Sequence, residues 1–199
     1  MSKAPEYHNI YELPAGLPVP FDDGACSHLV GMRMPRVALR STTGKRVDLA
    51  VVSSKRVLFF FPAAGRPGIP SPAGWNDIPG ARGCTPQICS FRDSTAEIQR
   101  LGFQIFGVSA QKYEDLLEIA QRNQVLYELL SDSELRLTRK LNLPTFEITP
   151  SAPLFPKTCI KRVTLIVESG RIRKVFYPVF PPDGNVVEVL TYLGKARNQ

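Results

Sequence analysis

The sequence has no long hydrophobic run. The longest, Val57 to Phe61, is far shorter than the roughly 20 residues that span a bilayer. The N-terminus also lacks a basic segment followed by an apolar one, which a secretory signal requires. We therefore expect no membrane association and a cytoplasmic protein.

Basic residues form no tract, although the chain is basic. It has 25 Lys+Arg against 18 Asp+Glu, a formal net charge of +7 at pH 7. Proteins that bind nucleic acid gather such charges on one face or carry a recognisable reading motif. Here short basic groups alternate with acidic residues. We expect a solvated basic surface and no nucleic-acid partner.

Cysteine and histidine are scarce. Four cysteines (Cys26, Cys84, Cys89 and Cys159) in 199 residues are too few for a disulfide scaffold. No second cysteine pair stands at zinc-ligand spacing, and both histidines lie near the N-terminus. We expect no metal, no cofactor and no histidine-based triad. Cys26 and Cys159 are most simply unpaired thiols. In a reducing compartment, a close pair such as Cys84 and Cys89 is more often redox-active or metal-binding than structural.

The chain has the length of one domain of ordinary size. Residues 1–30 carry four prolines and no periodicity, which predicts an extended arm, either lying on the domain or loose in solvent. Residues 31–199 are expected to form the domain. Within it, residues 62–83 are rich in proline and glycine, and an irregular connection of that length is usually functional.

The other residues alternate between short strands and helices. Strands are predicted at 36–40, 46–50, 56–61, 103–109, 126–130, 162–167 and 171–177. Helices are predicted at 85–101, 113–120, 132–141 and 186–195. The continuously apolar strand at 56–61 is expected to be central. This order favours an α/β, thioredoxin-like fold with a mixed central sheet, an N-terminal β-hairpin and flanking helices.

Cys84 stands where the proline-rich loop meets a predicted helix. Backbone N–H groups without helical partners and the positive end of the helix dipole would face its sulfur. This position favours the thiolate, which is the form of cysteine that attacks. Arg82 would add positive charge, and Gly83 would leave room for a substrate to approach the sulfur.

Cys89 lies five residues after Cys84. At that spacing in a helix, a rise of about 7.5 Å and a rotation of about 140° put the Cα atoms about 8.6 Å apart. A disulfide needs less than about 7 Å. Any disulfide between them would therefore require the first turn of the helix to unwind. The alternative is that both are buried thiols that pack as small hydrophobic groups.

The residues around Cys84 resemble those of a known family. Residues 83–93 (GCTPQICSFRD), with 57–62 (VLFFFP) before them, are similar to the Q-type peroxiredoxins, also called bacterioferritin comigratory proteins. The similarity extends to 31–39, 44–49, 107–109 and 162–167, and so covers residues from about 30 to 195.

This resemblance implies a thiol-dependent peroxidase. Cys84 would be the peroxidatic cysteine, which hydrogen peroxide or an organic hydroperoxide oxidises to a sulfenic acid. Cys89 would be the resolving cysteine, and a thioredoxin-like or other dithiol reductant would reopen the resulting disulfide. Arg162 matches the arginine that pairs with the thiolate, and Pro62 matches the proline that shields the pocket from water. A monomer or a weak dimer is expected.

Several positions depart from the family pattern. Ala81 stands where most members have a threonine whose hydroxyl binds peroxide. That hydrogen bond would be missing, or would come from Thr85, a backbone N–H group or an inserted residue. The insertion spans residues 69–79 and includes Trp75, which we expect to anchor the loop rather than cap the pocket. Gln87 replaces an acidic residue.

Two other functions stay open at this point. In a redox sensor or interaction module, oxidation of Cys84 would unwind the helix and expose a binding surface. A protein thiol-disulfide oxidoreductase is the second, although that activity usually goes with Cys-x-x-Cys, which the sequence lacks. Cys159, close in sequence to Arg162, is an alternative resolving cysteine. Continuous turnover of peroxide would identify a peroxidase.

Overall fold

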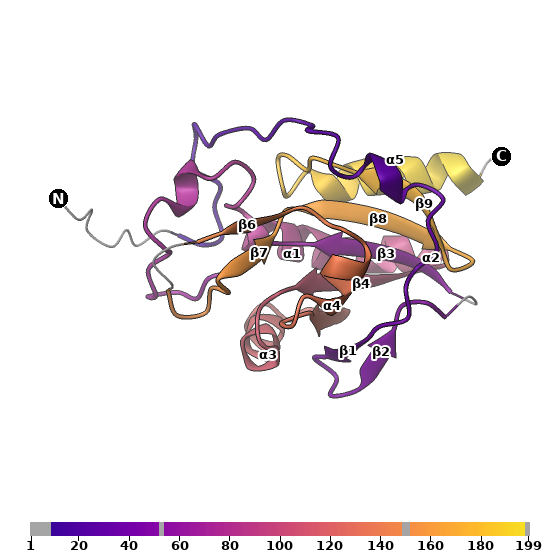
Figure 1. Ribbon diagram of the computed structural model, residues 1–199, viewed down its shortest axis with the longest axis horizontal. Coiled ribbons are helices and arrows are strands. Elements are labelled where there is room, and N and C mark those ends of the chain that lie inside the picture. Colours follow the sequence, from indigo (N-terminus) through magenta and orange to yellow (C-terminus); the bar gives the residue numbers. More distant parts are fainter. Residues whose placement is uncertain (1–8, 52–53, 149–151, 198–199) are drawn as a thin grey trace.

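A computed structural model describes residues 9–51, 54–148 and 152–197. Within them, a seven-stranded mixed sheet has the order β2-β1-β5-β4-β3-β8-β9 (Figure 1). Its strands are β1 (Ala38–Ser41), β2 (Arg46–Asp48), β3 (Lys55–Phe60), β4 (Phe103–Ser109), β5 (Glu128–Ser131), β8 (Val163–Glu168) and β9 (Arg171–Phe176). The strands β3, β4 and β5 are parallel, and β1 and β2 form the N-terminal hairpin. The predicted α/β class is confirmed.

Helices cover both faces of this sheet. They are α1 (Cys84–Asp93), α2 (Thr95–Arg100), α3 (Tyr113–Arg122), α4 (Arg136–Lys140) and α5 (Asn185–Arg197), with short 3-10 helices η1 (Ser27–Leu29) and η2 (Trp75–Asp77). Buried residues of α1, α2, α3 and α5 share one hydrophobic cluster, and those of α4 belong to another. In Figure 1, α4 accordingly lies in front of the sheet, whereas α1 and α2 lie behind it.

The strand β3 supplies side chains to both of these clusters. Val57 and Phe59 pack in the α1 cluster, whereas Leu58 and Phe60 pack in the α4 cluster, because successive side chains of a strand point to opposite faces. This explains its continuous apolar sequence. The strand is interior but not the middle one, since β4 occupies the centre of the sheet. The end of β3 leads into the loop before Cys84.

The helix predicted at 85–101 is interrupted at Ser94. This residue has φ −100° and ψ 6°, and it separates α1 from α2. The hydroxyl of Thr95 donates to the carbonyl of Phe91 at 3.0 Å. Serine and threonine hydroxyls can hydrogen-bond to nearby backbone groups, and these bonds compete with the backbone hydrogen bonds of a regular helix. The segment that carries Cys84 and Cys89 is therefore a helix of ten residues.

Two other regions differ from the sequence prediction. The helix predicted at 132–141 begins only at Arg136, because the carboxylate of Asp132 accepts from the N–H groups of Leu137 and Thr138, at 3.1 and 2.8 Å. A small antiparallel sheet of β6 (Thr145–Glu147) and β7 (Thr158–Ile160) was not predicted. It packs beside the loop that precedes Cys84, since Cys159 and Ala81 share one hydrophobic cluster.

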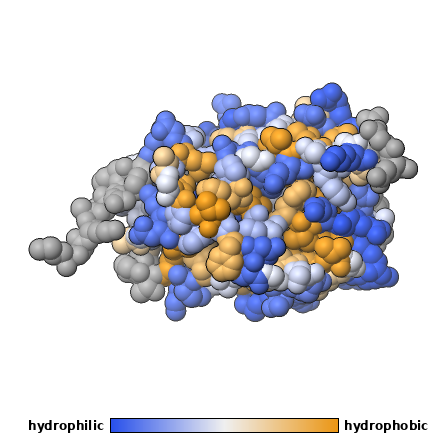
Figure 2. All heavy atoms as spheres, turned by 90° about the horizontal axis from the view of Figure 1, so that it is seen from above, coloured by the Kyte–Doolittle hydropathy of each residue, from blue (hydrophilic) through white to orange (hydrophobic). Residues whose placement is uncertain are grey.

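Residues 62–83 are irregular apart from η2, as predicted. None of the helices in the described part of the chain is long and apolar enough to span a membrane. On the face seen in Figure 2, hydrophobic residues lie in small groups between hydrophilic ones. Large exposed hydrophobic side chains, such as Phe21 and Leu126, are separate in sequence, which is normal for a protein surface.

Candidate active site

Cys84 is the first residue of α1, and Gly83 determines how the helix begins. Gly83 has φ 100°, a left-handed conformation that glycine adopts without strain. A Cβ atom there would lie 2.6 Å from Cδ2 of Leu13 and 2.7 Å from Cγ of Pro182. The first N–H groups of a helix have no intrahelical partners and carry partial positive charge. The sulfur of Cys84 therefore lies at an end of the helix that favours an anion.

Arg162 brings a positive charge to this sulfur. It stands directly before β8 and is 3% exposed, and its Nη2 donates to Sγ of Cys84 at 3.2 Å. The same Nη2 lies 3.2 Å from the carbonyl oxygen of Ala81 and 3.3 Å from that of Arg82. These contacts fix the guanidinium against the loop that carries Cys84. A charge-assisted hydrogen bond of this kind stabilises a thiolate.

Neutral side chains hold the other side of the guanidinium. Nη1 of Arg162 donates to Oε1 of Gln87, and Nε2 of Gln87 donates to Oδ1 of Asn185 at 3.1 Å. The hydroxyl of Thr164 donates to the same Oδ1 at 2.6 Å. Among the described residues, Arg162 has no carboxylate within ion-pair distance. Because a buried charge requires a partner, its positive charge is directed to Cys84.

A second guanidinium lies close to the site. Arg82 is 6% exposed, and burial lowers its pKa, whereas the negative charge of Cys84 acts in the opposite direction. Its Nη2 donates to the carbonyl oxygens of Asn9 and Glu12 at 2.6 and 3.4 Å. The sequence prediction that Arg82 adds positive charge is consistent with this position. Two backbone carbonyl oxygens near the N-terminus, those of Asn9 and Glu12, thus bind the guanidinium of Arg82.

A narrow pocket opens onto Cys84. Thr85 and Gly83 line it beside the cysteine, and Ser71 and Trp75 of the insertion line it from the loop. Trp75 is 4% exposed and packs edge-to-face on Phe155, with ring centroids 4.9 Å apart. The tryptophan thus anchors the insertion, as expected, and also forms part of the pocket wall. The inserted loop is therefore part of the site.

Pro62 and Ala81 lie behind this pocket and do not line it. Pro62 is buried, and its carbonyl oxygen accepts from the hydroxyl of Ser109 at 3.0 Å. Pro62 is followed by Ala63 and Ala64, which do line the pocket. Ala81 is fully buried in a cluster with Trp75, so no hydroxyl reaches the pocket from position 81.

The Redoxin family model matches residues 29–193. The chain belongs to the Redoxin family. It is 26% identical over 163 residues to a protein named Peroxiredoxin Q, chloroplastic, from Gentiana triflora, covering 81% of this chain and 65% of that protein. It is 27% identical over 146 residues to Peroxiredoxin Bcp of Escherichia coli K12, covering 71% of this chain and 81% of that one.

A solved structure agrees with this assignment at the level of the fold. The crystal structure of peroxidoxin BcpB from Mycobacterium tuberculosis is 24% identical and has a TM-score of 0.65, covering 84% of this chain and 97% of that one. The predicted thioredoxin-like fold and the predicted resemblance to Q-type peroxiredoxins are confirmed. The chain spans about two thirds of the length of the plant relatives, 65% for the one from Gentiana triflora.

The side chain of Cys89 points away from the pocket at Cys84. Its Sγ lies 3.9 Å from Oδ1 of Asn123, which follows α3. It is half-buried, and burial raises its pKa, an effect that the nearby Arg92 opposes. Both cysteines are free, and the turn between them is intact. Intact helix therefore separates the free thiol of Cys89 from Cys84.

The other two cysteines are buried away from solvent. Cys159 is fully buried in β7, and burial raises its pKa to about 12, to which the charge of Cys84 also contributes. Burial likewise raises the pKa of Cys26 to about 12. Such thiols are poor nucleophiles. Among the described residues, no group of three or more histidine, cysteine or acidic side chains is arranged to hold a metal ion.

Sequence reasoning missed three groups at the site. Asn185 and Thr164, which complete the support of Arg162, lie far from Cys84 in sequence and carry no motif. Ile10, which lines the pocket, belongs to a region without periodicity. No local pattern marks these residues, because only the folded chain brings them to Cys84.

Proposed function

We propose that this protein is a thiol peroxidase in which Cys84 attacks the peroxide. Its thiolate attacks the terminal oxygen of ROOH, so that an S–O bond forms and the O–O bond breaks. The sulfur loses two electrons and becomes a sulfenic acid. The leaving alkoxide takes up a proton and departs as an alcohol, or as water when the substrate is hydrogen peroxide. The 3.2 Å contact between Nη2 of Arg162 and Sγ of Cys84 carries this proposal.

The groups around Cys84 have distinct roles in this step. Arg162 and the start of α1 stabilise the negative charge first on the sulfur and then on the leaving oxygen. Gly83 and Thr85 line the pocket, where their backbone and the Thr85 hydroxyl would bind the peroxide. Pro62 supports this wall from behind. These assignments give the chain a substrate site without the threonine that Ala81 replaces.

Cys89 resolves the sulfenic acid in the second step. Its thiol sulfur attacks the sulfur of the Cys84 sulfenic acid, an S–S bond forms and water leaves. Because the two cysteines lie on different sides of intact helix, the first turns of α1 must unwind before they meet. An external dithiol of the thioredoxin type then reduces the disulfide through a mixed disulfide and becomes a disulfide itself.

The expected substrates are hydrogen peroxide and small organic hydroperoxides. The cycle requires a compartment that keeps dithiols reduced, which supports a cytoplasmic location. We propose that the protein acts as a monomer or weak dimer and engages neither nucleic acid nor membrane in this activity.

Peroxide consumption under a continuous supply of dithiothreitol or thioredoxin tests this function. The wild-type protein is expected to consume many equivalents of hydrogen peroxide, and Cys84→Ser none. Without the dithiol, Cys89→Ser is expected to accumulate a sulfenic acid at Cys84, which mass spectrometry detects as one added oxygen atom. Cys26→Ser serves as a control outside the site. Consumption of a single equivalent by the wild type would instead indicate a sensor, and activity in Cys84→Ser would overturn the proposal.

A further inference from the structure

A segment outside the Redoxin match reaches the pocket at Cys84. The match begins at residue 29, whereas Ile10 is one of the residues that line the pocket and is 8% exposed. A Cβ atom on Gly65 would lie 3.5 Å from Cγ2 of Ile10 and 3.9 Å from Cζ of Phe155. Ile10 therefore closes the side of the pocket between the loop after β3 and Phe155. We call residues 9–13 the strap.

Arg82 fixes the strap at the end nearest Cys84. Its guanidinium donates to the backbone carbonyl oxygens of Asn9 and Glu12, at 2.6 and 3.4 Å. Leu13 packs next to Gly83, at the place where any side chain on that glycine would lie. These anchors use backbone carbonyls and the Leu13 side chain. The strap therefore keeps them when the side chain of residue 10 is changed.

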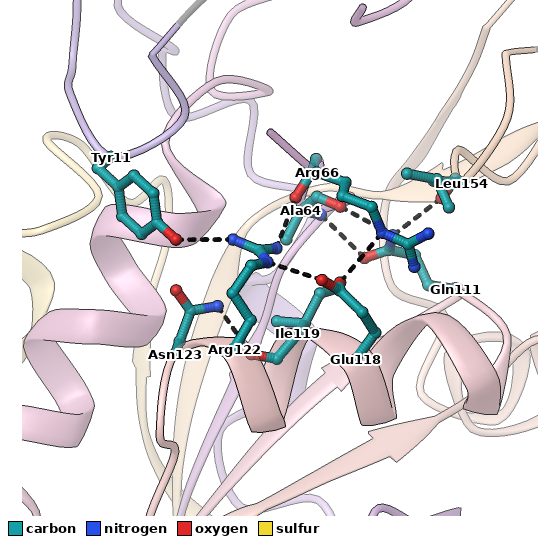
Figure 3. Close-up of polar contacts among 10 residues, drawn as sticks. Tyr11, Ala64, Arg66, Gln111, Glu118, Ile119, Arg122, Asn123 and Leu154 are labelled. Carbon is teal, nitrogen blue, oxygen red and sulfur yellow. Dashed lines mark hydrogen bonds and ion pairs between the residues drawn. The ribbon is translucent and has the colours of Figure 1, made fainter. Parts of the chain in front are cut away.

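Arg122 fixes the strap on the opposite side, at the end of α3 (Figure 3). Its Nη1 donates to the hydroxyl of Tyr11 at 3.0 Å, and its Nη2 donates to the carbonyl oxygen of Gly65 at 2.9 Å. Glu118, which also pairs with Arg66, holds Arg122 through a contact of 2.8 Å. One guanidinium thus joins the strap to the loop that forms the facing wall of the pocket.

The space left between these walls is small. The volume open to the centre of a water-sized sphere is about 10 Å³. That is about the room that one water molecule needs. Hydrogen peroxide is little larger than water, whereas an aryl hydroperoxide carries a ring next to its peroxide group. With the strap in place, the pocket fits the first of these substrates and not the second.

We infer that Ile10 is a specificity-determining residue, which the strap holds across the pocket so that hydrogen peroxide reaches Cys84 and bulky hydroperoxides are excluded. This inference rests on the proposed peroxidase function and names its preferred substrate class. The discrimination is expected to be large, since a single methylene in an apolar pocket changes selectivity by roughly 10-fold or more. Alanine at position 10 removes three carbon atoms from the wall.

The test compares the second-order rate constants for hydrogen peroxide and cumene hydroperoxide, measured by stopped-flow Trp75 fluorescence. Ile10→Ala is expected to raise the ratio of the cumene hydroperoxide constant to the hydrogen peroxide constant at least about tenfold. Tyr11→Phe, which loosens the strap but keeps Ile10, is expected to change the ratio in the same direction and by less. Val19→Ala is the matched control, because Val19 lies in the same region and is 66% exposed.

The outcomes separate the inference from the function on which it rests. If Ile10→Ala and Tyr11→Phe both keep the wild-type ratio of the two constants, the strap does not select substrates. If Ile10→Ala does not fold, as shown by its thermal transition, Tyr11→Phe alone decides. If the wild type reduces cumene hydroperoxide as fast as hydrogen peroxide, the inference also fails. If the wild type consumes neither peroxide, the proposed function itself fails.

Discussion

Replacing Arg162 with glutamine would remove the guanidinium that donates to Cys84. In the structure, Nη2 of Arg162 lies 3.2 Å from the sulfur. The other contacts of this guanidinium are with Gln87 and with carbonyl oxygens of the loop before Cys84, and these groups are neutral. Glutamine can still donate to a carbonyl oxygen but carries no charge. The substitution therefore tests the stabilisation of charge on the sulfur more than the packing of the loop.

The expected decrease in the rate constant follows from the strength of one hydrogen bond. A hydrogen bond to a charged group contributes roughly 1.5–3 kcal/mol. Each 1.36 kcal/mol in an activation free energy changes a rate tenfold. The rate constant for reaction of Cys84 with hydrogen peroxide should therefore fall by roughly 10- to 160-fold in Arg162→Gln. Arg162→Lys keeps the charge and should lose less.

Stopped-flow fluorescence with hydrogen peroxide in excess measures this rate constant directly. Arg173→Gln is the matched control, since it makes the same substitution at an exposed arginine of β9. The thermal transition of each variant shows whether the fold is kept. A folded Arg162→Gln protein that reacts within threefold of wild type would refute the role given to Arg162.

Two further predictions concern the helix and the stability of the fold. Oxidation to the Cys84–Cys89 disulfide should make the backbone amides in the first turns of α1 exchange hydrogen faster, while the amides of β4 stay protected. Equal protection of α1 in the reduced and disulfide forms would contradict the unwinding. Contacts with Lys161 and Tyr177 lower the pKa of Asp23 to about 2, so its contribution to stability is present at neutral pH and is lost as the pH falls from about 4 through 2. Asp23→Asn should therefore lower the melting temperature more at pH 7 than at pH 2. An equal loss at both pH values would argue against this ion pair.

Much of the fold could be predicted because it follows from local patterns. The continuous apolar run of β3 and the turn between β1 and β2 each depend on a few adjacent residues. The position of Cys84 at a helix start follows from the proline-rich loop before it and the apolar spacing after it. The break at Ser94 was missed because the apolar spacing continues across it, whereas a side-chain hydrogen bond from Thr95 ends the regular helix.

The surroundings of Cys84 were only partly predictable. Arg162 was identified through a resemblance, and its contact with the sulfur depends on pairing of β8 with β3. The support from Asn185 joins the start of α5 to α1, across a sequence separation of 98 residues. The strap is held largely by backbone carbonyls, such as that of Asn9, which any residue type supplies. Such contacts leave no trace in composition or periodicity.

The site of first oxidation tests the central claim most directly, because only a cysteine ionised as the thiolate attacks a peroxide. The reduced Cys89→Ser protein would be treated with one equivalent of hydrogen peroxide at pH 7, and each cysteine peptide would be examined for added oxygen by mass spectrometry. Cys84 is expected to take up the oxygen, whereas Cys26 and Cys159, whose pKa values burial raises, are expected to stay reduced. Oxidation of Cys26 or Cys159 to the same extent as Cys84 would contradict the account.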